Sequence, residues 1–133
     1  MAKTLRSQTL SIAIESDPAK VYGFVFNPGN LPKWAKTFCK SVTKLNDDWI
    51  IDTPRGSMKV RFVEKNGFGV LDHYVNPAPE IEVYVPMRVL PNGSGSEVIF
   101  TLFRLPDMSD ERFAEDVGMV ERDLKTLKNV LES

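Results

Sequence analysis

The sequence contains one histidine, His73, and its imidazole is the best candidate for acid and base chemistry near neutral pH. Asn66-Gly67 is a preferred two-residue sequence for a type I′ hairpin turn, and such a turn pairs Val60 with His73. Strand alternation then places His73 on the same face as Phe62 and Leu71. We therefore expect His73 to point inward, where it can hydrogen-bond a ligand or move a proton. The pattern fits equally well a core histidine whose ring nitrogens are satisfied by neighbouring groups.

No activating partner for His73 is visible nearby in the sequence. The same hairpin register places Asp72 on the opposite face, paired with Arg61, so a local histidine and aspartate dyad is excluded. Cys39 is the only cysteine, and no helix N-terminus, histidine or second cysteine is present to lower the pKa of its thiol. We therefore expect neither a cysteine nucleophile nor a conventional zinc site.

Two arginines and one tryptophan are further candidates for contact with a ligand. Alternation along their strands places Arg61 and Arg88 on the outer face, where an ion pair or solvent is the expected partner. Trp34 lies in a short helical segment, Leu31–Phe38, that would cap the open end of a groove. Its indole can touch a ligand there or pack in the core.

The element that must cover these side chains is the last one, a single helix over Ser109–Glu132. Its apolar residues recur at steps of four and three, which places them on one stripe: Phe113, Val117, Val120, Leu124, Leu127 and Leu131. Ser109 is a suitable N-cap, and Asp110 and Glu111 lie where the helix dipole is positive. A helix of about 36 Å needs a broad apolar surface beneath it, and a sheet provides one.

The first part of the chain predicts a strand, two short helices and the start of a series of hairpins. Apolar and small polar residues alternate over 9–14, and Asp17-Pro18 is a strong helix start. The second helical segment, Leu31–Phe38, leads into a strand over Phe38–Leu45. The turns that follow do not fix a register, so the face occupied by Trp49 stays open.

A second hairpin is predicted with a definite register. Ile81–Leu90 carries apolar residues at every odd position, and Pro91–Ser96 is a turn. Pairing Leu90 with Glu97 across this turn places the apolar residues of both strands on one face. Pro86 within the first strand indicates an edge or a bulge.

Composition limits the classes of protein that the chain can represent. With 133 residues and a net charge of −1, we expect a single domain over residues 1–133 that does not bind nucleic acid. No run approaches the roughly 18 apolar residues of a membrane span, and the N-terminal residues lack the apolar centre of a signal peptide. We therefore expect a cytoplasmic location, no stable membrane insertion and no cofactor. The sequence does not indicate an oligomeric state.

The order of strand, two short helices, antiparallel strands and long closing helix resembles the START-like superfamily. This group includes lipid-transfer domains, bacterial polyketide cyclases and dehydratases, and plant pathogenesis-related allergens. The similarity rests on four segments: Ile12–Phe26, Leu31–Trp34, Val85–Phe103 and Met108–Glu132. It implies an α+β helix-grip fold, in which a curved antiparallel sheet wraps around the C-terminal helix and encloses a cavity. It implies no fixed catalytic set.

Three functions remain open at this point. The first is binding of a small hydrophobic molecule, such as a lipid or a polyketide-like compound, in the cavity between sheet and helix. The second is a cyclase or dehydratase in which His73 is the catalytic acid or base. The third is a protein-interaction module with a filled interior. The residues expected to contact a ligand are Trp34, Val60, Phe62, His73, Val83, Val85, Met87, Phe100, Val117 and Val120.

Overall fold

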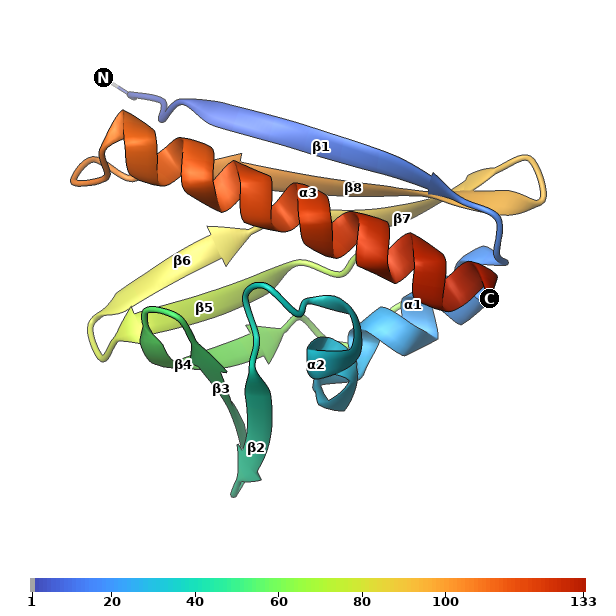
Figure 1. Cartoon of the computed structure of the whole chain (residues 1–133), viewed down its shortest axis with the longest axis horizontal. Helices are drawn as coiled ribbons and strands as arrows, with labels where there is room; N and C mark the ends of the chain where they lie inside the picture. Colours follow the sequence, from blue (N-terminus) through green and yellow to red (C-terminus); the bar gives the residue numbers. More distant parts are fainter. Residues whose placement is uncertain (1) are drawn as a thin grey trace.

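The computed structural model describes residues 2–133 and confirms the α+β helix-grip fold (Figure 1). Its strands form two antiparallel sheets, one with the order β1-β8-β7 and one with the order β2-β3-β4-β5-β6. The strands are β1 (Ser7–Ile14), β2 (Ser41–Leu45), β3 (Asp48–Thr53), β4 (Gly56–Phe62), β5 (His73–Ala78), β6 (Ile81–Val85), β7 (Met87–Asn92) and β8 (Gly95–Phe103). The helices are α1 (Pro18–Phe26), the 3₁₀ turn η1 (Pro28–Asn30), α2 (Leu31–Trp34) and α3 (Asp110–Glu132).

Helix α3 forms where the apolar stripe and the capping residue predict it. The Ser109 hydroxyl accepts a hydrogen bond from the Arg112 amide at 3.0 Å, which satisfies one of the free amides of the first turn. Every residue of the stripe is buried except Val120, which is half-buried. Figure 1 shows α3 running across the strands, with α1 and α2 beside its C-terminal half. The helix therefore closes over the sheets as predicted.

The short helices between β1 and β2 also follow local signals. The Asp17 carboxylate accepts a hydrogen bond from the Ala19 amide at 2.8 Å, and Pro18 occupies the first turn of α1. Helix α2 is shorter than the predicted segment, because it ends at Trp34 and residues 36–38 form a turn.

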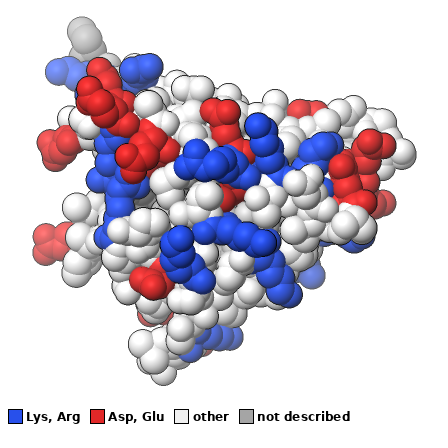
Figure 2. Space-filling model, viewed as in Figure 1, with Lys and Arg blue, Asp and Glu red and all other residues white. Residues whose placement is uncertain are grey.

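Lys and Arg side chains gather across the middle of the face that carries α2 and α3 (Figure 2). This exposed face is therefore charged, and the apolar side of α3 is turned inward.

Pro86 divides the predicted strand over residues 81–90 into β6 and β7, which belong to different sheets. Proline has no amide hydrogen to donate, so the strand cannot continue its ladder through this position. The Pro86 carbonyl oxygen still accepts a hydrogen bond from the Thr101 amide at 3.0 Å. Beyond the break, Leu90 pairs with Glu97, which confirms the predicted register of the second hairpin.

The predicted type I′ turn at Asn66-Gly67 is wrong. The side-chain oxygen of Asn66 accepts hydrogen bonds from the amides of Phe68 and Val70, and its side-chain nitrogen donates to two nearby carbonyl groups. These bonds stabilise a loop over residues 63–72 instead of a tight turn. Strand β4 therefore pairs with β5 two residues further along than predicted, with Phe62 opposite His73. A shift of two residues preserves the face of every side chain, so His73 still points inward.

The end of this loop joins the two sheets. The Leu71 amide donates to the Met87 carbonyl oxygen at 2.8 Å, and the Val89 amide donates to the Gly69 carbonyl oxygen at 2.9 Å. Gly69 has φ +72°, and a side chain at this position would collide with the Val89 carbonyl oxygen. A glycine is therefore required where the loop crosses onto β7.

The predicted ion pair between Arg61 and Asp72 is also wrong, because it depended on the tight turn. Arg61 lies on the outer face, 3.3 Å from a Glu82 carboxylate oxygen and 4.5 Å above the Tyr74 ring centroid. Asp72 is buried at the junction of the sheets, where Arg88 donates a hydrogen bond to it at 2.9 Å. Neither arginine is available as an anion-binding group in the interior.

The pairing of β3 with β4 determines the orientation of Trp49, which the sequence left open. Trp49 lies opposite Val60, and Ile51 lies opposite Met58, so all four side chains share the inward face. Trp49 is half-buried, and the Lys44 ammonium group lies 5.5 Å from its ring centroid.

None of the helices in residues 2–133 has the length and apolar character needed to cross a lipid bilayer.

Candidate functional site

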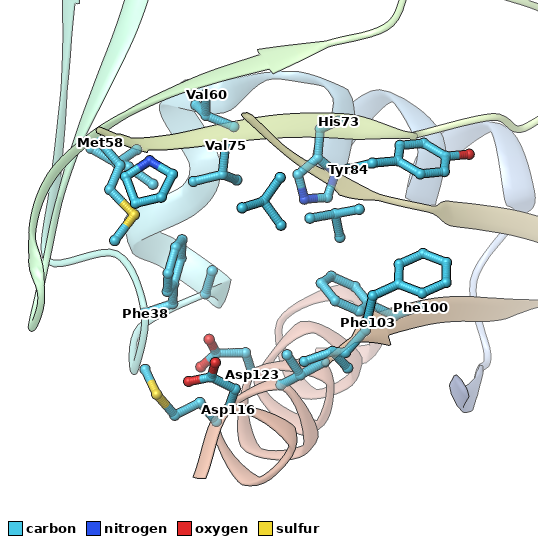
Figure 3. Close-up of a pocket in the computed structure, with 18 of the residues that line it drawn as sticks. Phe38, Met58, Val60, His73, Val75, Tyr84, Phe100, Phe103, Asp116 and Asp123 are labelled. Atoms are coloured by element: carbon cyan, nitrogen blue, oxygen red, sulfur yellow. The ribbon is translucent and has the colours of Figure 1, made fainter. Parts of the chain in front are cut away.

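A pocket of about 200 Å³ lies between the inner face of the five-stranded sheet and α3. Figure 3 shows Val60, His73 and Val75 on the sheet side, with Asp116 and Asp123 on the α3 side. The wall between them comes from β8 and the segment after it, and from α2 and the turn that follows. Most of the lining is aliphatic or aromatic, so the interior favours an apolar molecule.

Eight of the ten residues predicted to contact a ligand line this pocket. They come from α2, four strands and α3: Trp34, Val60, Phe62, His73, Val83, Val85, Phe100 and Val120. The alternation of β4, β5, β6 and β8 placed six of them on the inward face, because the predicted and the observed registers agree on the face that these residues occupy.

Met87 and Val117 do not line the pocket. Met87 is fully buried in the core, since the break at Pro86 carries it into the other sheet, where α1 packs against β7. Val117 is buried near the side of α3 that carries Lys128, which donates to the Ala13 carbonyl oxygen of β1. Both residues therefore contribute to packing and not to the pocket surface.

Several lining residues were missed by the sequence reasoning. The apolar ones include Phe38, Ile51, Met58, Val75, Phe103, Met108 and Met119, and the polar or charged ones include Arg55, Tyr84, Thr101, Arg112, Asp116 and Asp123. Ile51 and Met58 face each other across the β3 and β4 hairpin, whose register the turn residues did not fix. Met119 and Asp123 lie outside the apolar stripe of α3, so helical periodicity gave no signal for them.

His73 projects from β5 into the pocket (Figure 3). Its Nδ1 lies 3.0 Å from the Leu71 carbonyl oxygen, and its ring centroid lies 4.8 Å from that of Phe62 and 6.0 Å from that of Phe100. Burial lowers the pKa of His73, and the Leu71 hydrogen bond and the charge of Asp72 oppose this only in part. The imidazole is therefore neutral near pH 7.

Asp123 is a buried carboxylate on the α3 side of the pocket, with 4% of its surface exposed. One oxygen accepts hydrogen bonds from the Thr37 amide at 2.9 Å and the Thr37 hydroxyl at 2.7 Å. Burial raises the pKa of Asp123, and the hydrogen bonds from Thr37 oppose this increase. The contact fixes the turn after α2 to the middle of α3.

Arg55 connects the turn between β3 and β4 to α3. Its guanidinium group lies 2.7 Å from a carboxylate oxygen of Asp116 and 2.7 Å from one of Glu115. Arg112 lies 3.9 Å from the other oxygen of Asp116. Arg55, Arg112 and Asp116 line one edge of the pocket, and their charges are already paired.

Trp34 and Cys39 are both buried near α2. Trp34 lines the pocket with 4% of its surface exposed, and its indole nitrogen has no hydrogen-bond partner among residues 2–133. Burial, with smaller contributions from the charges of Asp123 and Asp52, raises the pKa of the Cys39 thiol to about 11. A thiol that stays protonated at neutral pH is a poor nucleophile.

The same fold occurs in several solved structures. XoxI from Bacillus cereus superposes with a TM-score of 0.77 at 20% identity, over 96% of this chain and 96% of that one. The Aha1 dimer from Colwellia psychrerythraea gives 0.76 at 15% identity, over 96% and 97%. DynU16, a protein of the dynemicin biosynthetic locus, gives 0.73 at 11% identity, over 96% of this chain and 47% of that one.

These similarities establish a shared architecture and no more, because the identities are low. No family model matches the sequence, and no curated protein matches it. The chain therefore has the helix-grip fold, which it shares with the Aha1 dimer and DynU16.

Proposed function

We propose that this protein binds a small hydrophobic molecule, of lipid or polyketide-like character, in the pocket between the five-stranded sheet and α3. The observation that carries the proposal is the space of about 200 Å³ that the apolar side chains surround without filling. Transfer of an apolar molecule from water into such a site is favourable by roughly 25 cal/mol for each Å² buried. Candidate contacts are Trp34, Val60, Phe62, His73, Val83, Val85, Phe100 and Val120.

The chemistry of the lining supports binding more than catalysis. A neutral His73 can accept a proton, so a cyclase or dehydratase activity with this residue as base is the second candidate. No carboxylate among the described residues contacts the ring, however, and Asp72 is engaged with Tyr84, Met87 and Arg88. A base that is oriented only by a backbone carbonyl oxygen, with no carboxylate to stabilise the imidazolium, favours a role as a polar contact for a ligand.

A protein-interaction module with a filled interior is the third possibility, and the pocket argues against it. Such a module would need its sheet and helix to interdigitate as a close-packed core does. The pocket is instead lined by half-buried side chains such as Val83, Val85 and Phe100, which still expose surface. This arrangement favours an occupant.

The proposal is tested by native mass spectrometry of the purified protein, together with thermal unfolding against medium-chain alcohols, fatty acids and naphthalene derivatives. We expect a retained small molecule or an increase in melting temperature with part of this panel. Val83→Trp should fill the pocket and abolish both effects. Ile81→Trp is the matched control, because Ile81 lies on the same strand, is exposed and does not line the pocket.

Circular dichroism of both variants verifies that each is folded before binding is compared. A wild-type protein of bare mass, whose melting temperature is unchanged by every compound in the panel, would overturn the proposed function. The same conclusion follows if a folded Val83→Trp protein binds as the wild type does.

A further inference from the structure

The hydrogen-bonding state of His73 limits the chemistry of the molecule that the pocket accepts. A carbonyl oxygen can only accept a hydrogen bond, so the 3.0 Å contact between His73 Nδ1 and the Leu71 carbonyl oxygen requires the hydrogen on Nδ1. In a neutral imidazole, Nε2 then carries a lone pair and no hydrogen. The ring lines the pocket, so it presents an acceptor to any occupant.

No group in the described part of the chain donates a hydrogen bond to Nε2. Within residues 2–133, the only hydrogen bond of the His73 ring is the one to Leu71. The nearest aromatic neighbours are Phe62 and Phe100. Neither side chain has an N–H or O–H group that could donate a hydrogen bond to Nε2. An acceptor in an apolar environment is costly until it receives a hydrogen bond.

Apart from the indole N–H of Trp34, which is buried beneath the wall, the side-chain donors elsewhere on the pocket wall are already engaged. Arg55 and Arg112 pair with carboxylates on α3. The Tyr84 hydroxyl donates to Asp72 at 2.8 Å, and the Thr101 hydroxyl is bound to the Thr9 hydroxyl at 2.8 Å. The pocket therefore offers a ligand a free acceptor at His73 and an apolar surface around it.

We infer that the ligand carries a hydroxyl group, phenolic or alcoholic, that donates a hydrogen bond to Nε2 of His73. A molecule with only a carbonyl or ether oxygen at this position would place two acceptors against each other. The inference rests on the proposed function, since it assumes that a small apolar molecule occupies the pocket. It adds the polar group that orients the molecule there.

The test uses 2-naphthol and 2-methoxynaphthalene, which share a ring system and differ in the hydroxyl hydrogen. Calorimetric titration of the wild-type protein at pH 7.5 should give an affinity for 2-naphthol higher by roughly tenfold or more, the effect of one satisfied buried hydrogen bond. His73→Phe keeps an aromatic ring beside Phe62 and should bind both compounds equally. Thr43→Val is the control, because Thr43 is exposed on β2 and does not line the pocket, and it should retain the preference for 2-naphthol.

A second measurement does not depend on a ligand or on a variant. Nitrogen-15 NMR of the imidazole in the free wild-type protein at pH 7.5 should show hydrogen on Nδ1 and none on Nε2. The opposite tautomer, or an imidazolium ring, would overturn the inference.

The titrations separate this inference from the proposed function. Equal wild-type affinity for the two compounds would overturn the requirement for a hydroxyl group and leave pocket binding intact. Retention of the preference in His73→Phe would do the same. Binding of neither compound would count against pocket binding itself, whatever the tautomer of His73.

Discussion

Asp123 shows how a single buried side chain connects two elements. Its carboxylate is largely removed from water, and together with the Met119 carbonyl oxygen it hydrogen-bonds Thr37, which links the turn after α2 to the middle of α3. Periodicity places Asp123 beside the apolar stripe of α3 and not on it, so nothing in the local sequence indicates this contact. The link follows from the approach of two segments 86 residues apart.

Replacing Asp123 with Ala should lower the free energy of unfolding by about 1–3 kcal/mol, because the partly buried amide of Thr37 loses its acceptor, while its hydroxyl keeps only the Met119 carbonyl oxygen. Asp123→Asn retains a carbonyl oxygen at the same position, so its loss should be much smaller at neutral pH. Urea unfolding of the two variants measures the difference. Equal losses would show that the contact with Thr37 is unimportant.

The raised pKa of Asp123 predicts a pH dependence. Because burial raises this pKa above 3.8, the folded protein holds the proton at pH values where the unfolded chain has released it. The contribution of Asp123 to stability is therefore present below pH 3.8 and is lost as the pH rises through the raised pKa. Asp123→Asn cannot titrate, so its stability relative to wild type should increase across that window. If the curves of unfolding free energy against pH for the wild type and Asp123→Asn run parallel, the predicted pH dependence is wrong.

At the scale of elements, α3 is the most strongly determined part of the protein. Its N-cap, its acidic first turn and its buried stripe all agree, and consistency of this kind is what makes a helix predictable. Strands β6 and β7 behave differently, because they read as one strand in sequence and are divided by Pro86 between two sheets. The apolar alternation continues through the break, so Pro86 alone indicated an irregularity there, and the predicted edge or bulge is in fact a change of sheet.

The packing of α3 is tested by Leu124→Asp. Leu124 is 2% exposed in the core, and a charge there would have no partner, so we expect a loss of several kcal/mol and the loss of cooperative unfolding. Arg122→Ala is the control on the same helix, since Arg122 is exposed, and it should change stability by no more than about 0.5 kcal/mol. Thermal unfolding by circular dichroism compares them. Similar melting temperatures would mean that α3 does not close over the sheets.

At the scale of the whole molecule, Asp72 stabilises the junction between the two sheets. Its carboxylate accepts hydrogen bonds from the Tyr84 hydroxyl, the Met87 amide and the Arg88 guanidinium, at 2.8 to 2.9 Å. These partners lie on both sides of the break at Pro86. The bend that gives the pocket its wall is therefore held by a polar group, in addition to the apolar core.

Replacing Asp72 with Ala should lower the free energy of unfolding by at least about 2 kcal/mol, because the buried amide of Met87 is left without an acceptor. Glu82→Ala is the matched control. It removes the ion pair between Glu82 and Arg61. Both side chains are exposed, so the free energy of unfolding should fall by no more than about 1 kcal/mol. Chemical denaturation of both variants decides between them. A loss for Asp72→Ala no larger than that for Glu82→Ala would mean that the junction does not depend on this carboxylate.

The sequence by itself determined the features that depend on neighbouring residues. Three such features are confirmed: the stripe and cap of α3, the Asp17 cap of α1, and the pairing of Leu90 with Glu97. Each is specified by residues that are near one another in sequence. Strand alternation also determined which face His73 occupies. That result survived an incorrect turn only because the register moved by an even number of residues.

Only the tertiary structure decided the register around Asn66, the division at Pro86 and the polar contacts of the pocket. Asn66 folds its loop through side-chain hydrogen bonds, and the end of that loop is held by β7, which lies about twenty residues further along the chain. The contact of Asp123 with Thr37 and the position of Met87 in the core, away from the pocket, also depend on segments that are distant in sequence. Local patterns fix periodicity and caps, whereas a partner distant in sequence is fixed only when the chain has folded.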